Sequence, residues 1–95
     1  MDLKELFDKI VEYKEQVVTV EGWIRNHRDQ KTFGFIDFSD GTCQEHLQIV
    51  YDEKLENFQE IRKLLVGCAI RVTGKIVESS GNQAYEMKAD GIELL

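Results

Sequence analysis

The stretch VTVEGWIR, residues 18–25, decides the fold because its apolar and polar side chains alternate. Val18, Val20 and Ile24 fall on one face, with Gly22 between them. A period of two residues is typical of a half-buried β-strand. A glycine inside such a strand indicates a sharp bend, which a strand needs when it pairs with both halves of a closed sheet. We therefore expect a long, bent first strand.

Strand patterns continue on the C-terminal side of this stretch. Residues 33–38, FGFIDF, stop at the turn signal Asp40-Gly41, and residues 45–51 continue as EHLQIVY. The polar residues 26–32 are the predicted loop between the first and second strands. Three strands in this order predict an antiparallel meander.

Helical patterns lie before and after the meander. Asp2 followed by Glu5 has the spacing of a capping box, and the apolar residues behind it recur at helical intervals, which predicts a helix over 2–15. A second helical face lies within 54–66 and ends at Gly67, a typical C-cap residue. The apolar positions of the two faces are Leu3, Leu6, Phe7, Ile10 and Val11, then Leu55, Phe58, Ile61, Leu64 and Leu65.

Two more strand patterns close the chain. Residues 68–76 alternate again, a loop at 79–82 follows, and a last strand runs through Tyr85, Met87 and Ala89. Five strands with a helix between the third and fourth are typical of a five-stranded OB-fold barrel, an all-β architecture. An SH3-like barrel or an open α+β sheet is the alternative, and neither explains the helix within 54–66 as simply.

Length and composition indicate one small domain. The 95 residues contain no proline, linker or repeat, so we expect a single domain over 1–95, with its barrel over 17–95. No apolar run is long enough to span a membrane, and Cys43 and Cys68 show neither disulfide nor zinc spacing, so we expect a cytoplasmic protein with reduced thiols. The net charge of −6 argues against nonspecific adhesion to nucleic acid.

Strand parity predicts a polar and aromatic face outside the barrel. If Ile36 and Phe38 enter the core with Gly34, Phe33 and Phe35 project outward. On the third and last strands the same rule directs Gln48, Glu86 and Lys88 outward, and it places inside the residues that alternate with them: Leu47, Ile49, Tyr51, Tyr85 and Met87. An aromatic ring, an amide and a carboxylate on one surface are the groups needed to hold an unstacked base.

A basic cluster borders this predicted face. Residues 25–31 carry Arg25, Arg28 and Lys31 against the single acid Asp29, a local charge of +2 in a chain of −6. Such cations pair with phosphate or with base edges. A solvated loop is the alternative interpretation of the cluster.

No catalytic or metal-binding motif is found in the sequence. It has no nucleophile elbow, phosphate-binding glycine loop or HExxH pattern, and His27 and His46 lack metal-ligand spacing and are expected to be surface residues. We expect no cofactor and no enzymatic activity from this chain alone.

The residues together resemble a known family. GWIRNHRDQKTFGFIDFSDGT at 22–42, followed by LQIV at 47–50, is similar to the N-terminal anticodon-binding domain of class IIb aminoacyl-tRNA synthetases, and among them most similar to the asparaginyl type. The resemblance extends over nearly the whole chain. It implies an OB-fold that binds the anticodon loop of a GUU-type tRNA, with a C-terminal catalytic domain, absent from these residues, that uses ATP and magnesium.

The resemblance also implies roles for single residues. Phe35 matches the phenylalanine that stacks on the middle anticodon base, a uridine, and Arg28 and Gln48 match residues that hydrogen-bond in the same pocket. Glu86 matches a glutamate that reads a neighbouring base. Arg25 and Lys31 are expected near phosphates, and Phe33 beside Phe35.

Two other functions remain open at this point. An OB barrel also serves as a protein-interaction or self-association module, which the acidic net charge favours, and a generic single-strand binder would show no base preference. We expect the isolated domain to be a monomer, whereas a self-associating module would change mass with concentration.

Overall fold

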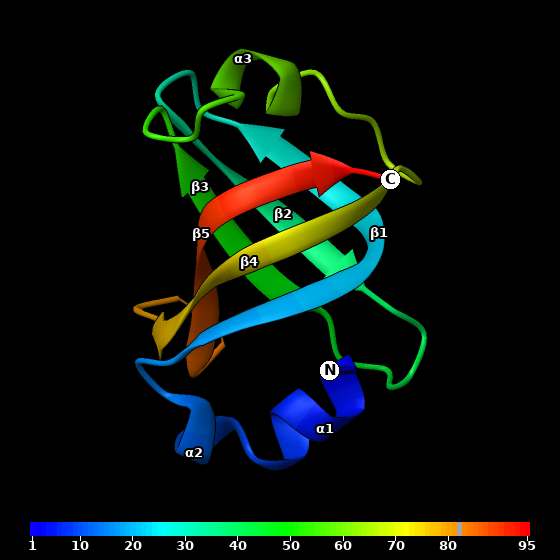
Figure 1. Cartoon of the computed structure of the whole chain (residues 1–95), viewed down its shortest axis with the longest axis vertical. Coiled ribbons are helices and arrows are strands. Elements are labelled where there is room, and N and C mark those ends of the chain that lie inside the picture. Colours follow the sequence, from blue (N-terminus) through cyan, green and yellow to red (C-terminus); the bar gives the residue numbers. More distant parts are fainter. Residues whose placement is uncertain (82) are drawn as a thin grey trace.

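The computed structural model describes residues 1–81 and 83–95, so Asn82 of the predicted 79–82 loop lies outside the described residues. Within the described part, five strands form a closed barrel in the order β1-β2-β3-β5-β4, which confirms the predicted OB-fold (Figure 1). The elements in chain order are α1 (Leu3–Asp8), α2 (Ile10–Tyr13), β1 (Val17–Asp29), β2 (Phe33–Ser39), β3 (Leu47–Asp52), α3 (Phe58–Ile61), β4 (Ala69–Glu78) and β5 (Tyr85–Leu94).

The bent first strand is confirmed. β1 pairs with β4 through Val17–Trp23 and with β2 through Trp23–Asp29, so one strand belongs to both halves of the barrel. Gly22 lies where these pairings meet, and a Cβ there would overlap the backbone oxygen of Ser39 and approach the Phe38 ring to 2.8 Å. The strand therefore needs a glycine at the bend.

β1 is longer than predicted and contains a bulge. The predicted loop 26–32 is wrong over Asn26–Asp29, which continue the strand against β2. The register shifts between Ile24 and Asn26, which leaves Arg25 as the extra residue of a β-bulge. On the C-terminal side of the bulge, the residues that strict alternation would place inside the barrel point outward.

The helices are shorter than predicted. The expected helix over 2–15 is divided into α1 and α2, because Lys9 between them leaves helical geometry at φ −126° and ψ 27°. The Asp2 cap is confirmed, since its carboxylate accepts from the Glu5 backbone N–H at 2.8 Å. Within 54–66, α3 covers four residues only and ends well before Gly67. Gly67 instead adopts φ +96° and donates its N–H to the Ile24 carbonyl at 2.8 Å.

The helices lie at the two ends of the barrel, α3 at one end and α1 with α2 at the other (Figure 1). Their buried side chains, Leu3 and Leu6 from α1 and Phe58 and Ile61 from α3, join the core of the barrel. Among the described helices, none combines the length and apolar character needed to span a membrane.

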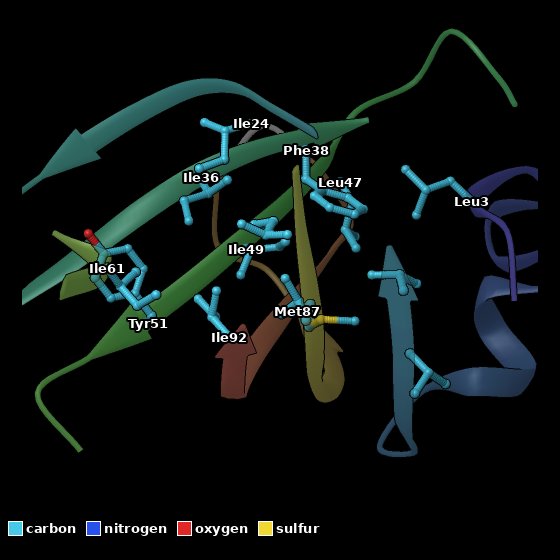
Figure 2. Close-up of a cluster of buried hydrophobic side chains, with 14 of the residues drawn as sticks. Leu3, Ile24, Ile36, Phe38, Leu47, Ile49, Tyr51, Ile61, Met87 and Ile92 are labelled. Atoms are coloured by element: carbon cyan, nitrogen blue, oxygen red, sulfur yellow. The ribbon is translucent and has the colours of Figure 1, made fainter. Parts of the chain in front are cut away.

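The predicted core positions on β2 and β3 are confirmed. Figure 2 shows side chains of the core pointing toward one another inside the barrel. Tyr85, expected inside, is half-buried against the core, and Cys68 is also half-buried. The confirmed inward residues are Gly34, Ile36, Phe38, Leu47, Ile49, Tyr51 and Met87.

Asp40 attaches α1 to the barrel. Its carboxylate accepts from the Leu3 N–H at 2.8 Å and from the Thr42 hydroxyl at 2.6 Å. Burial alone would raise the pKa of Asp40, but these hydrogen bonds outweigh it, so the pKa lies below its usual value. Because the folded-state pKa is depressed, this contribution to stability is present above the unfolded pKa and is lost as the pH falls through the folded value.

Asp40→Ala is expected to lower the free energy of unfolding by about 1–3 kcal/mol, since it removes charge-assisted hydrogen bonds from a partly buried backbone. Urea denaturation at pH 7 measures this loss. The difference between the wild type and the variant should shrink as the pH falls through the depressed folded-state pKa of Asp40, because the wild-type carboxylate then becomes protonated. A difference that persists unchanged at low pH would contradict the role given to the ionised carboxylate.

Candidate nucleic-acid interface

The outer face of β1, β2, β3 and β5 brings most of the candidate residues together. One row of residues crosses the four strands. It pairs Arg28 with Phe35, Phe35 with Val50, and Val50 with Lys88. Gln48 lies on the same face of β3, two positions before Val50. Glu86 lies two positions before Lys88, on the same face of β5. The predicted outward face is confirmed as a geometric arrangement.

Phe35 is at the centre of an aromatic cluster. Its ring is half-buried and meets the exposed ring of Phe33 edge to face, with centroids 5.4 Å apart and planes at 84°. The Arg28 guanidinium carbon lies over the Phe35 ring, 4.8 Å from its centroid. Arg28 therefore covers, in the unbound protein, a ring that could stack on a base.

Gln48 and Glu86 are in direct contact. The Gln48 side-chain Nε2 donates to Glu86 Oε1 at 3.3 Å, and both residues are half-buried. Together they place amide and carboxylate hydrogen-bonding groups beside the aromatic cluster, because Gln48 is a diagonal neighbour of Phe35 on the sheet. A base stacked on Phe35 would thus present its edge to polar groups.

The other two predicted cations lie at the border of this face. Arg25 is the exposed bulge residue of β1. Lys31 is exposed in the turn before β2, where its φ of 75° is left-handed and its N–H donates to the Asp29 carboxylate at 3.0 Å. Arg28, by contrast, is the cation that lies over the Phe35 ring.

Arg62, which the sequence reasoning missed, compensates the one acid of the basic cluster. Its Nη2 lies 3.0 Å from Asp29 Oδ2, and its Nε donates to both carboxylate oxygens. The hydrogen bond from Arg62 holds the pKa of Asp29 below its usual value. Because Arg62 follows α3 by sequence, far from Asp29, no local pattern could reveal this pair. The charges of Arg25, Arg28 and Lys31 are consequently not offset by Asp29.

His27 is not the surface histidine expected. It is half-buried on the inner side of β1, with Nδ1 2.8 Å from the Leu64 carbonyl and Nε2 2.6 Å from the Tyr51 hydroxyl. A carbonyl only accepts, so Nδ1 donates to the Leu64 oxygen, and Nε2 shares a hydrogen bond with the Tyr51 hydroxyl. The histidine links three parts of the chain and leaves the outer face to Arg28.

The outer face of β1, β4 and the end of β5 has a different electrostatic character. There Arg71 pairs with Glu21 at 2.6 Å and with Glu93 at 3.6 Å, so its charge is neutralised locally. Among residues 1–81 and 83–95, by contrast, no carboxylate lies within 4.0 Å of the cationic groups of Arg25, Arg28 or Lys31. The face that carries Phe35 is therefore the better site for an anionic ligand.

Comparison with known proteins agrees with this geometry. The model of the tRNA anticodon family, described as an OB-fold nucleic acid binding domain, matches residues 18–95. The chain belongs to this family. The family model describes a nucleic-acid-binding domain and not a catalytic one. This agrees with the prediction that this chain alone is not an enzyme.

Curated relatives of this chain include asparagine–tRNA ligases. Asparagine–tRNA ligase of Bacillus cytotoxicus is 45% identical over 93 residues, which cover 97% of this chain and 20% of the ligase. The enzyme of Acetivibrio thermocellus is 46% identical over 94 residues, with the same coverage. The chain thus spans about a fifth of the length of these relatives. The resemblance to the asparaginyl type is confirmed.

A solved structure shows the same fold. Asparaginyl-tRNA synthetase from Pyrococcus horikoshii, complexed with asparaginyl-adenylate, superposes with a TM-score of 0.78 at 19% identity, over 88% of this chain and 20% of that one. At this level of identity the likeness concerns the barrel alone.

Proposed function

We propose that this domain binds the anticodon loop of a GUU-type tRNA on the outer face of β1, β2, β3 and β5. The middle uridine stacks on Phe35, and Gln48 and Arg28 hydrogen-bond to its edge. Glu86 reads a neighbouring base, while Arg25 and Lys31 lie near phosphates. The observation that carries the proposal is the gathering of Arg28, Phe35, Gln48 and Glu86 on one face of an anticodon-family barrel.

Stacking on Phe35 requires Arg28 to move. A guanidinium over a ring at the protein surface contributes about 0.5–1 kcal/mol, and a stacked base contributes about 1–3 kcal/mol. The exchange is favourable overall, and the released Arg28 is then available for the base edge or a phosphate. Arg28 thus covers the half-buried Phe35 ring until an RNA base takes its place.

The full proposal concerns a larger protein. Residues 1–95 would act as one RNA-binding unit of a cytoplasmic asparagine–tRNA ligase, whose catalytic domain supplies ATP-dependent aminoacylation. Without the contacts of that domain, the isolated unit should bind the anticodon loop weakly, as a monomer.

A binding comparison tests the proposal. A fluorescently labelled anticodon stem-loop bearing GUU is expected to bind at least about tenfold more tightly than the same loop with its middle uridine replaced by adenosine, a difference of about 1.4 kcal/mol. Fluorescence anisotropy at low and moderate salt measures both affinities.

The salt series separates base reading from phosphate attraction. Phosphate contacts weaken as salt rises in both loops alike, whereas the ratio between the loops should persist. Equal affinity for the two loops at every salt concentration, or no binding of either, would reject anticodon reading. Sedimentation at increasing protein concentration then tests the alternative of a self-association module.

A further inference from the structure

We infer that Glu86 determines the preference for uridine over cytidine at this site, by fixing the orientation of the Gln48 side-chain amide. The inference rests on the proposed function, because it concerns the base that stacks on Phe35. It gives Glu86 a role beyond contact with a neighbouring base: a positioning residue that acts through Gln48.

The direction of the hydrogen bond between these residues sets the amide orientation. The two ends of a glutamine amide have nearly the same shape but opposite hydrogen-bonding character, since the NH₂ donates and the oxygen accepts. A carboxylate only accepts. The Gln48 NH₂ therefore has to face Glu86 Oε1, 3.3 Å away, and the Gln48 oxygen is directed to the other side. With Glu86 in place, the opposite orientation would bring two acceptors together.

The backbone of Gln48 is also held in position. The side-chain amide of Gln83 accepts from the Gln48 N–H at 3.2 Å and donates to the His46 carbonyl at 2.6 Å. These bonds to residues two apart reproduce the pattern of a parallel ladder, whose backbone rungs between β3 and β5 are Ile49 with Met87 and Val50 with Lys88. Gln83 thus adds a side-chain rung next to Gln48. Because the Gln48 backbone is held in place, the base that Gln48 recognises depends mainly on whether the NH₂ or the oxygen of its amide faces that base.

An amide oxygen favours uridine because uracil carries a hydrogen-bond donor at N3. The edge of uracil presents an N3–H donor between two carbonyl oxygens, whereas N3 of cytosine is an acceptor. The Gln48 oxygen accepts from uracil N3–H but faces cytosine N3 as a second acceptor, and buried unpaired acceptors are unfavourable. A rotated amide, with its NH₂ toward the base, would reverse this preference.

Glu86→Gln tests the inference, with anticodon stem-loops bearing GUU and GCU as probes in fluorescence anisotropy. A glutamine at this position both donates and accepts, so it no longer dictates which end of the Gln48 amide faces the base. The wild type is expected to favour GUU over GCU by about tenfold or more. In the variant we expect this ratio to fall to about threefold or less, chiefly because GCU binds better.

Asp37→Asn is the matched control. Asp37 lies opposite Gln48 on β2 and is also half-buried, and the substitution removes the same charge while both partners of the Gln48–Glu86 bond are retained. Loss of one negative charge should affect the binding of both loops alike, so Asp37→Asn should keep the wild-type ratio. A Glu86→Gln ratio equal to that of the wild type overturns the inference. If the wild type itself does not distinguish GUU from GCU, the proposed base reading fails before Glu86 is at issue.

Discussion

Phe35→Ala is expected to weaken binding of a GUU anticodon stem-loop by about 2- to 30-fold. Loss of a stacked base corresponds to about 1–3 kcal/mol, or about 5- to 150-fold, when the ring is otherwise unoccupied. Here the Arg28 guanidinium covers the ring in the unbound protein, and this contact is given up when a base stacks. The exchange removes about 0.5–1 kcal/mol from the gain, which leaves about 0.5–2 kcal/mol, or about 2- to 30-fold.

Phe33→Ala is the control for this variant. Phe33 meets Phe35 edge to face and is 38% exposed, so it supports the stacking ring without offering its own face in the same plane. We expect a loss of about threefold or less, within the contribution of one aromatic pair. Anisotropy titrations measure both affinities, and thermal unfolding verifies that both variants fold. If folded Phe35→Ala binds RNA with wild-type affinity, Phe35 is not part of the binding site.

The barrel could be predicted from the sequence because its signals are local. Alternation of apolar residues fixes which side of a strand is buried, and this rule placed Ile36, Phe38, Leu47 and Ile49 correctly. The outward direction of Phe35 and Gln48 followed from the same parity. The order of the strands, with a helix between the third and fourth, then indicated the OB-fold.

The errors have a common cause, which is pairing between distant segments. The bulge at Arg25 exists because β1 must leave β4 and join β2, and it reverses the parity of the residues after it. Strict alternation beyond Arg25 would direct His27 outward and Arg28 inward, the opposite of what the structure shows. The partners of Asp29 and Gln48, which are Arg62 and Gln83, come from other elements and leave no mark in the local pattern.

Gly34→Ala is expected to destabilise the fold by about 2–4 kcal/mol. Gly34 lies opposite Tyr51 across β2 and β3, and a Cβ there would overlap the Tyr51 hydroxyl and ring, with Cε1 2.7 Å away. Tyr51 has no space to withdraw, because it is only 1% exposed and packs against Phe58 and His27 with centroids 5.9 and 5.7 Å away. Overpacking of this kind costs about 1–3 kcal/mol, and loss of the bond to His27 adds about 1 kcal/mol.

Urea denaturation measures the loss, and Gly91→Ala is the control, since no heavy atom lies within 4 Å of a Cβ added there.

The pH dependence of stability identifies Tyr51 as the cause of the loss. Burial raises the pKa of Tyr51 to about 12, so wild-type stability should be fully present below the ordinary tyrosine pKa near 10 and fall as the pH rises toward about 12. In Gly34→Ala the displaced hydroxyl should titrate closer to its ordinary value, and this alkaline loss should shrink. Equal stability of the two alanine variants would show that Tyr51 yields to the added methyl without cost.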